Sequence, residues 1–209
     1  VAIIGASGSG KTTISQLIAG FYAKNSGDIL YNDISIDNIS KKSLREHLFL
    51  VLQMPILFNN TLRFNLTMGE DISNEKIKEA LKIAQLNSML ENLPDGLDTI
   101  VGKMGIRLSG GQRQRLSIAR MILANPSVVI FDESTSALDV QTETKLFENL
   151  ENILKDKTVI TIAHRLSTVK NASKIFVLED GELVQSGTHM ELEDEIGHYK
   201  EFVKHQLLN

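Results

Sequence analysis

The amino-acid sequence predicts an α/β fold built on a mostly parallel β-sheet. Short apolar runs without polar alternation are typical of strands covered on both faces of such a sheet, and they occur at Val1–Ile4, Phe49–Leu52, Val128–Phe131, Val159–Ile162 and Ile175–Leu178. Patterns with helical spacing of apolar residues lie between these runs, at Thr12–Ala19, Asn74–Leu86, Gln112–Ala124, Thr142–Leu154 and Ile196–Leu207. Strands that alternate with helices through right-handed crossovers form a doubly wound sheet.

One long segment interrupts this alternation. Residues 59–125 contain no convincing buried strand, and we expect them to form a helical subdomain inserted into the α/β core. The core then consists of residues 1–58 and 126–209. Gly27–Tyr31 and Glu182–Gln185 are predicted to be two further strands.

Composition limits the classes of function. A chain of 209 residues suffices for one sizeable core. The net charge of −4 gives no basic surface, so we expect no nucleic-acid partner. The absence of cysteine excludes disulfides and cysteine-based zinc sites. No apolar run is long enough to span a bilayer. Because Val1 lies inside a predicted strand and no initiator Met precedes it, we expect the chain to be a fragment.

The segment GASGSGKT at residues 5–12 follows the first predicted strand directly and fits the phosphate-binding P-loop pattern G-x-x-x-x-G-K-[ST]. Glycines let successive backbone N–H groups converge on phosphate oxygens, and the helix that follows points its positive dipole end at the same anion. Lys11 is expected to reach the β- and γ-phosphates, and Thr12 offers a hydroxyl to Mg²⁺. The sequence therefore predicts a nucleotide-binding site.

Polar residues also follow other predicted strands. Gln53 follows the second strand, the pair Asp132 and Glu133 follows the third, and His164 follows the fourth. Ligands of open α/β sheets bind outside the carboxyl ends of the strands. Each residue alone has a simpler explanation, as a strand end, a turn cap or a loop histidine. Together with the P-loop they favour a single site.

Asp132 and Glu133 are neighbours, and neighbouring side chains on an extended backbone point to opposite faces. One carboxylate can therefore hold Mg²⁺, directly or through water. The other can face the water that attacks the γ-phosphate, where general-base assistance is worth about 10²–10⁴-fold.

A second glycine motif, LSGGQ at residues 108–112, precedes another helical pattern. Its backbone N–H groups and the Ser109 hydroxyl would form a second anion site at a helix N-terminus. A single triphosphate does not need two such sites from the same polypeptide, which suggests that the second site serves a nucleotide held by another protomer. A simple serine helix cap with glycines in the turn is the alternative.

These motifs together resemble the nucleotide-binding domain of ABC transporters over essentially the whole chain. GASGSGKT resembles the Walker A motif, Gln53 the Q-loop glutamine, LSGGQ the signature, VVIFDE at 128–133 the Walker B motif, SALD at 136–139 the D-loop and His164 the switch histidine. The resemblance implies a P-loop NTPase fold with a RecA-like core. It also implies a head-to-tail pair of cassettes, homo- or heteromeric, with ATP sandwiched between one P-loop and the other signature motif.

The resemblance also implies roles for individual residues. Nucleotide binding falls to the loop and the signature, at Gly5, Ser7, Gly8, Ser9, Gly10, Lys11, Thr12, Thr13, Ser109, Gly110 and Gly111. Thr12, Gln53 and Asp132 would support Mg²⁺. The catalytic residues would be Glu133 as the base, His164 as the sensor of the γ-phosphate, Lys11 and Gln53. Asp139 would help to tie the two sites together.

Several segments resemble the exporter branch, including DTIVG at 98–102, which is similar to the exporter X-loop, although Lys103 stands where exporters often have Glu. The expected partners are a second cassette and a transmembrane domain at the cytoplasmic face of the membrane. The family's adenine-stacking aromatic residue would precede Val1. A non-transport ABC-type ATPase, DNA-organising or ribosome-associated, is the alternative. A degenerate regulatory cassette is a third hypothesis, disfavoured by Glu133, LSGGQ and His164.

Overall fold

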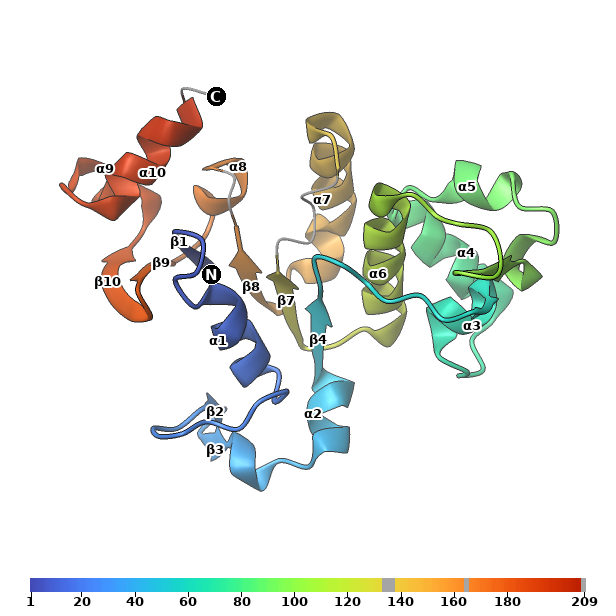
Figure 1. Cartoon of the computed structure of the whole chain (residues 1–209), viewed down its shortest axis with the longest axis horizontal. Helices are drawn as coiled ribbons and strands as arrows, with labels where there is room; N and C mark the ends of the chain where they lie inside the picture. The colour runs from blue at the N-terminus through green and yellow to red at the C-terminus, as the bar shows by residue number, and fades with distance from the viewer. Residues whose placement is uncertain (133–137, 164–165, 208–209) are drawn as a thin grey trace. The chain divides into compact units, whose positions relative to one another are not determined.

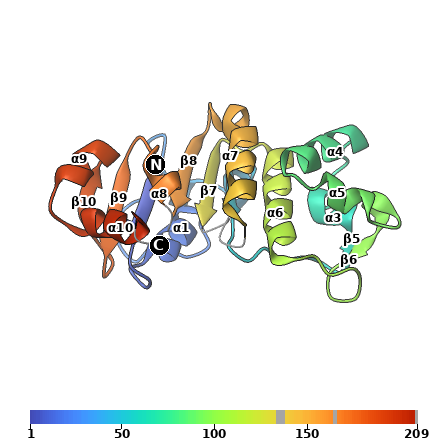
Figure 2. The same cartoon turned by 90° about the horizontal axis from the view of Figure 1, so that it is seen from above.

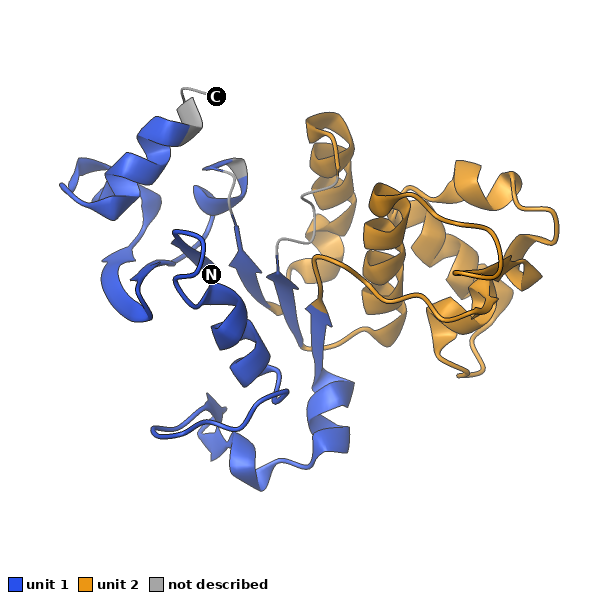
Figure 3. Ribbon diagram, in the orientation of Figure 1, with its two compact units in different colours: residues 1–50, 128–133, 159–209 blue, residues 51–127, 134–158 orange. Residues whose placement is uncertain are grey.

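The structure is a computed structural model that describes residues 1–132, 138–163 and 166–207 (Figure 1). The chain divides into two compact units (Figure 3). The first unit comprises residues 1–50, 128–133 and 159–209, and the second comprises residues 51–127 and 134–158. The predicted helical insertion, residues 59–125, lies within the second unit. The second unit also contains the helix Val140–Leu154.

The first unit is built on a six-stranded sheet with the strand order β10-β9-β1-β8-β7-β4. In chain order these strands are β1 (Ala2–Gly5), β4 (Leu48–Val51), β7 (Val128–Asp132), β8 (Thr158–Ile162), β9 (Ile175–Glu179) and β10 (Glu182–Gly187). Strand β1 pairs in parallel with β8 and with β9, and β10 runs antiparallel to β9 as its hairpin partner (Figure 2). The mostly parallel α/β sheet is as predicted, and each of the five predicted buried strands lies within one residue of its expected bounds.

The remaining elements of the first unit surround this sheet. They are α1 (Lys11–Ile18), β2 (Leu30–Tyr31), β3 (Ile34–Ser35), the 3₁₀ helix η1 (Ile36–Asn38), α2 (Lys41–His47), α8 (Leu166–Val169), α9 (His189–Asp194) and α10 (His198–Leu207). The strand predicted at Gly27–Tyr31 begins only at Leu30, and Gly27 takes a φ of 72°, outside the extended region. It ends at Tyr31 as predicted, where Asn32 and Asp33 adopt positive φ and form a tight turn between β2 and β3. Apolar residues of β1 and β9 pack with α9 and α10, where Tyr199 is fully buried.

The second unit is mainly helical. It contains β5 (Asn60–Thr61), α3 (Leu62–Thr67), α4 (Asn74–Ile83), α5 (Asn87–Glu91), η2 (Gly96–Asp98), β6 (Ile100–Val101), α6 (Gly110–Ala124) and α7 (Val140–Leu154). Buried apolar residues of α3, α4, α5 and α6 form one core. Helix α4 ends before the predicted Leu86, because Gln85 takes a left-handed φ of 56°. In the described parts of both units, no helix is long and apolar enough to cross a membrane.

A buried polar cluster holds α3 and α6 together in this unit. The Asn65 side chain has no exposed surface, and its Oδ1 accepts from the Phe58 N–H at 2.9 Å and from Arg120 at 3.0 Å. Its amide donates to the carbonyls of Phe58 and Thr61, each at 3.0 Å. Arg120 also donates to the Asn65 carbonyl and, at 2.9 Å, to that of Ile56. Burial lowers the pKa of Arg120 to about 10, which leaves it protonated at neutral pH.

Replacing Asn65 with alanine therefore leaves several buried backbone groups and the Arg120 guanidinium short of partners. We expect Asn65→Ala to lower the free energy of unfolding by about 3 kcal/mol, since each buried group left without a partner costs about 1–3 kcal/mol. Urea denaturation followed by circular dichroism measures this. Asn87→Ala, at an exposed position on α5, is the control and should change it by about 0.5 kcal/mol or less. Equal stabilities of the two variants would contradict the role of the cluster.

Candidate nucleotide-binding site

The loop between β1 and α1 is closed around a lysine. Lys11 is only 5% exposed, and its Nζ donates to the carbonyl oxygens of Gly5 at 2.9 Å and Ala6 at 2.7 Å. The Ser9 hydroxyl lies 3.4 Å from the same nitrogen. Buried charges require such partners. The ammonium group thus sits inside the loop, where a phosphate bound over it would meet a fixed positive charge.

Glycines make this loop geometry accessible. A Cβ atom on Gly5 would lie 2.1 Å from the carbonyl oxygen of Leu178 on the neighbouring strand, so no side chain fits there. Gly8 and Gly10 take φ values of 84° and 95°, which favour glycine. Gly10 is the N-cap of α1 and provides no side-chain cap. By contrast, α2, α3, α4, α6, α7 and α9 begin with a Ser, Thr or Asp side chain that accepts from a backbone N–H.

The start of α1 therefore suits an anion. The first N–H groups of any helix lack intrahelical partners and carry its positive dipole end. With no capping side chain and with exposed Ser7 and Gly8 on the loop, the phosphate oxygens of a nucleotide can approach the backbone directly. Thr12 and Thr13 are exposed on the first turn of α1. The loop and the first turn of α1 thus fit the phosphates of a nucleoside triphosphate.

The β9–β10 turn supports the loop from another side. The N–H of Gly181 donates to the Ser9 carbonyl at 3.2 Å, and Asp180 and Gly181 both take positive φ, as tight hairpin turns require. The sequence analysis did not connect Asp180 and Gly181 with the P-loop. The hairpin-turn composition was the available signal, but it does not identify the partner.

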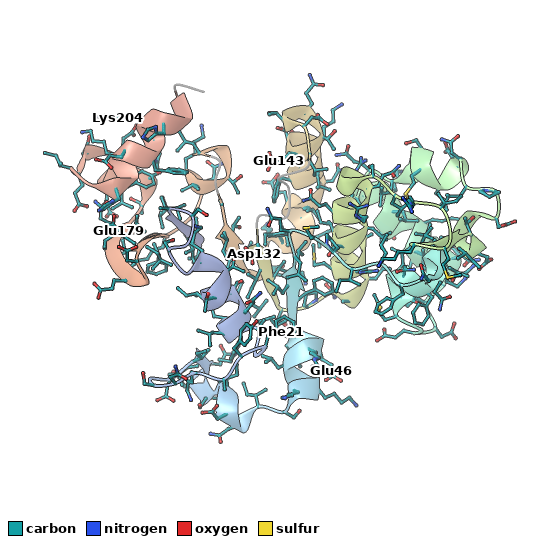
Figure 4. All side chains as sticks on the ribbon, viewed as in Figure 1. Phe21, Glu46, Asp132, Glu143, Glu179 and Lys204 are labelled. Atoms are coloured by element: carbon teal, nitrogen blue, oxygen red, sulfur yellow. The ribbon has the colours of Figure 1, made fainter. Side chains whose placement is uncertain are left out.

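Asp132 meets the P-loop helix at the carboxyl end of β7 (Figure 4). It is 4% exposed, and its Oδ1 accepts from the Thr12 hydroxyl at 3.3 Å. A carboxylate and a hydroxyl are the hard oxygen ligands that Mg²⁺ prefers, and Mg²⁺ in nucleotide sites takes one or two protein ligands beside phosphates and waters. These two oxygen atoms fit that pattern, and they belong to the same unit as the P-loop.

The second glycine motif lies in the second unit, at the start of α6. Ser109 forms a capping box: its Oγ accepts from the Gln112 N–H at 3.2 Å, and Gln112 Oε1 accepts from the Ser109 N–H at 2.8 Å. Ser109 is thus a helix cap, as in the alternative interpretation of this motif. A capping hydroxyl keeps its own proton to donate, so the cap does not prevent contact with a phosphate. Gly110 and Gly111 add no side chains to this turn.

Two further predicted residues lie in the second unit. The carbonyl of Gln53 accepts from the Gln114 side chain at 3.1 Å; Gln114 is a buried residue of α6 that sequence reasoning did not single out. Asp139 caps α7, accepting from the Thr142 hydroxyl at 2.7 Å and from the Thr142 N–H at 2.9 Å. These hydrogen bonds, the hydroxyl first, lower the pKa of Asp139.

Three arginines after the signature donate hydrogen bonds within the second unit. Arg113 donates to the Leu108 carbonyl, Arg115 to that of Gln85 at 2.9 Å, and Arg120 belongs to the Asn65 cluster. Among the predicted site residues, the structure brings together Gly5, Ser9, Lys11, Thr12 and Asp132. Glu133 and His164 lie outside the described residues, and their roles stay predictions.

This loop, its helix and the acidic strand end define the first unit as a P-loop nucleotide-binding fold. Comparison with known proteins specifies the class further. Residues 1–136 match the family described as ABC transporter, and the chain belongs to this family of transport ATPases.

An ATP-dependent lipid A-core flippase of Chromobacterium violaceum is 47% identical over 200 residues, which are 95% of this chain and 34% of the flippase. A putative multidrug export ATP-binding/permease protein of Staphylococcus aureus is 46% identical over 201 residues, which are 96% of this chain and 35% of that protein. The solved structure of a bacterial Atm1-family ABC exporter with ATP bound has a TM-score of 0.92 and 40% identity, covering 99% of this chain and 36% of the exporter.

The chain thus spans about a third of the length of the relatives it matches. The predicted resemblance to exporter-type ABC cassettes is confirmed. Both relatives and the solved structure are described as a flippase or as export proteins.

The Gly5 contact gives a direct test of the loop. Gly5→Ala places a methyl group against backbone, which costs about 1–3 kcal/mol, and we expect it to weaken ATP binding at least tenfold, about 1.4 kcal/mol. Isothermal titration calorimetry measures the affinity. The matched control is Gly27→Ala, where φ is also positive (72°) but nothing lies within 4 Å of the added methyl. Unchanged ATP affinity in Gly5→Ala would show that the loop does not bind phosphate.

Proposed function

We propose that this chain hydrolyses Mg²⁺·ATP and that hydrolysis drives export of a substrate through a membrane-spanning domain. The observation that supports it most directly is the convergence of the Lys11 ammonium group, the uncapped start of α1 and the Thr12–Asp132 oxygen pair in one unit. The similarity to exporters over nearly the whole chain supports the transport role.

Each of the expected site residues has a separate role in the proposed phosphoryl transfer. The P-loop from Gly5 to Thr13 holds the phosphates, and Lys11 offsets their charge. Thr12 and Asp132, with Gln53, would hold Mg²⁺, which supplies charge neutralisation on the β- and γ-phosphates when bound. Glu133 is placed by its sequence position to accept the proton of the attacking water, and His164 to contact the γ-phosphate. Positioning and electrostatics dominate such a reaction.

The base assignment is tested by Glu133→Gln, which keeps the size and polarity of the side chain but removes its basicity. We expect ATP hydrolysis to fall by about 100-fold or more, while ATP affinity changes little. A coupled assay of phosphate release and calorimetry measure the two quantities. Glu148→Gln on the exposed face of α7 is the control for the same chemical change. Full turnover by Glu133→Gln would refute the assignment.

A second cassette is part of the proposal. Ser109, Gly110 and Gly111 would bind the γ-phosphate of an ATP held by the P-loop of the partner cassette, and Asp139 would connect the two sites. The exposed position of Ser109 at the start of a helix of 15 residues supports this, because a capping hydroxyl keeps its own proton to donate and a helix N-terminus attracts an anion.

A membrane partner is supported by an apolar patch on the second unit, consisting of Ile56, Phe58, Ile100, Met104 and Ile106. These segments are joined: Met104 N–H donates to Asn59 Oδ1 at 3.1 Å, Ile106 N–H donates to the Ile100 carbonyl at 3.0 Å, and β5 pairs with β6. Exposed apolar side chains that gather in this way mark interaction surfaces. We propose that this patch docks on the cytoplasmic side of the membrane domain.

Met104 tests the patch because it is 88% exposed and contributes little to folding. In the intact transporter, Met104→Glu should lower transport and substrate-stimulated hydrolysis about tenfold, which corresponds to about 1.4 kcal/mol of docking energy, without changing ATP affinity. Transport into membrane vesicles measures this. Met190→Glu is the matched control, at an 80% exposed methionine on α9 of the first unit. Equal transport by the two variants would place the membrane contact elsewhere.

A further inference from the structure

A buried serine lies on the P-loop helix beneath the nucleotide site. Ser15 has no exposed surface and follows Thr12 by three residues on α1, so both side chains share one helix face. The Ser15 hydroxyl lies 3.1 Å from Asp132 Oδ2 and 2.8 Å from the carbonyl oxygen of Thr12. This serine belongs to none of the motifs that the sequence analysis singled out.

The two oxygen atoms of Asp132 are therefore held differently. Oδ1 faces the Thr12 hydroxyl at 3.3 Å, and Oδ2 faces the Ser15 hydroxyl. An ionised carboxylate only accepts hydrogen bonds, so both hydroxyls donate toward it, with the Thr12 carbonyl as a second acceptor for Ser15. Two donors one helical turn apart fix the rotation of the carboxylate about its own axis.

Resting on the function proposed above, we infer that Ser15 is a positioning residue that sets the affinity of the Thr12–Asp132 pair for a divalent cation. It holds Oδ2 toward α1 and thereby keeps Oδ1 beside the Thr12 hydroxyl. It touches neither the cation nor the nucleotide. Mg²⁺ demands near-ideal octahedral geometry, and loss of a partner that orients a metal ligand typically costs about 10–100-fold in metal affinity.

A purely structural serine would behave differently. Helical serines often donate only to the carbonyl three or four residues earlier, and Ser15 does contact the Thr12 carbonyl. Removing such a bond would change stability without changing how strongly Mg²⁺ promotes nucleotide binding. The distinguishing quantity is therefore the ratio of the ATP dissociation constants measured in EDTA and in Mg²⁺.

The experiment measures this ratio by calorimetry in the full-length protein for the unchanged chain, Ser15→Ala, Ser15→Thr and Ser117→Ala. We expect Ser15→Ala to lower the ratio about tenfold while ATP affinity in EDTA stays within about twofold. Ser15→Thr retains a hydroxyl and should restore most of the ratio. Ser117→Ala removes a buried serine from α6 and should leave it unchanged.

Manganese provides a second readout that does not depend on hydrolysis. The electron paramagnetic resonance spectrum of Mn²⁺ bound with ADP should broaden in Ser15→Ala and sharpen again in Ser15→Thr, because a carboxylate that has lost the Ser15 hydrogen bond is less constrained and makes the coordination more heterogeneous. An unchanged ratio in Ser15→Ala, or an equal loss in EDTA, would overturn the inference alone. Absence of ATP binding by the unchanged protein would overturn the proposed function, and this inference with it.

Discussion

The burial of the Lys11 ammonium group inside the P-loop is the constraint on which the rest of the site depends. A charge leaves water at high cost unless acceptors surround it, and the carbonyls of Gly5 and Ala6 and the Ser9 hydroxyl provide them. The backbone must curl tightly to turn these oxygens inward, which it does through positive φ at Gly8 and Gly10. The need to surround the Lys11 ammonium group with acceptors thus determines the shape of the loop.

Three strands stabilise that curl from different sides. Strand β1 leads into the loop, and its Gly5 pairs with Leu178 of β9 so closely that a side chain is excluded. The turn after β9 donates a hydrogen bond to the loop through Gly181. Strand β7 contributes Asp132, which the hydroxyls of α1 hold. Since parallel strands end at one edge of a sheet, the loop, the cation ligands and the bracing turn meet there.

The sequence predicts the strands of the six-stranded sheet, the glycine loops and the acidic strand end, because each is a local pattern. It does not predict which buried polar atoms meet. Ser15 and Asp132 are 117 residues apart, and Arg120 and Asn65 are 55 apart. Helical spacing places Ser15 on the face of Thr12, but its contact with Asp132 depends on the position of β7 in the sheet. The early end of α4 depends on the single left-handed residue Gln85, whose residue type gives no such signal.

Hydrogen bonds within each unit fix the positions of the expected site residues of that unit. Groups that act on a nucleotide must be held within about 0.5 Å of their productive positions by supporting contacts. In the first unit, Lys11 and Asp132 receive that support from the loop and from α1. In the second unit, Gln112 holds Ser109, and Gln114 holds the backbone at Gln53. These hydrogen bonds thus come from residues of the same unit as the groups that they hold.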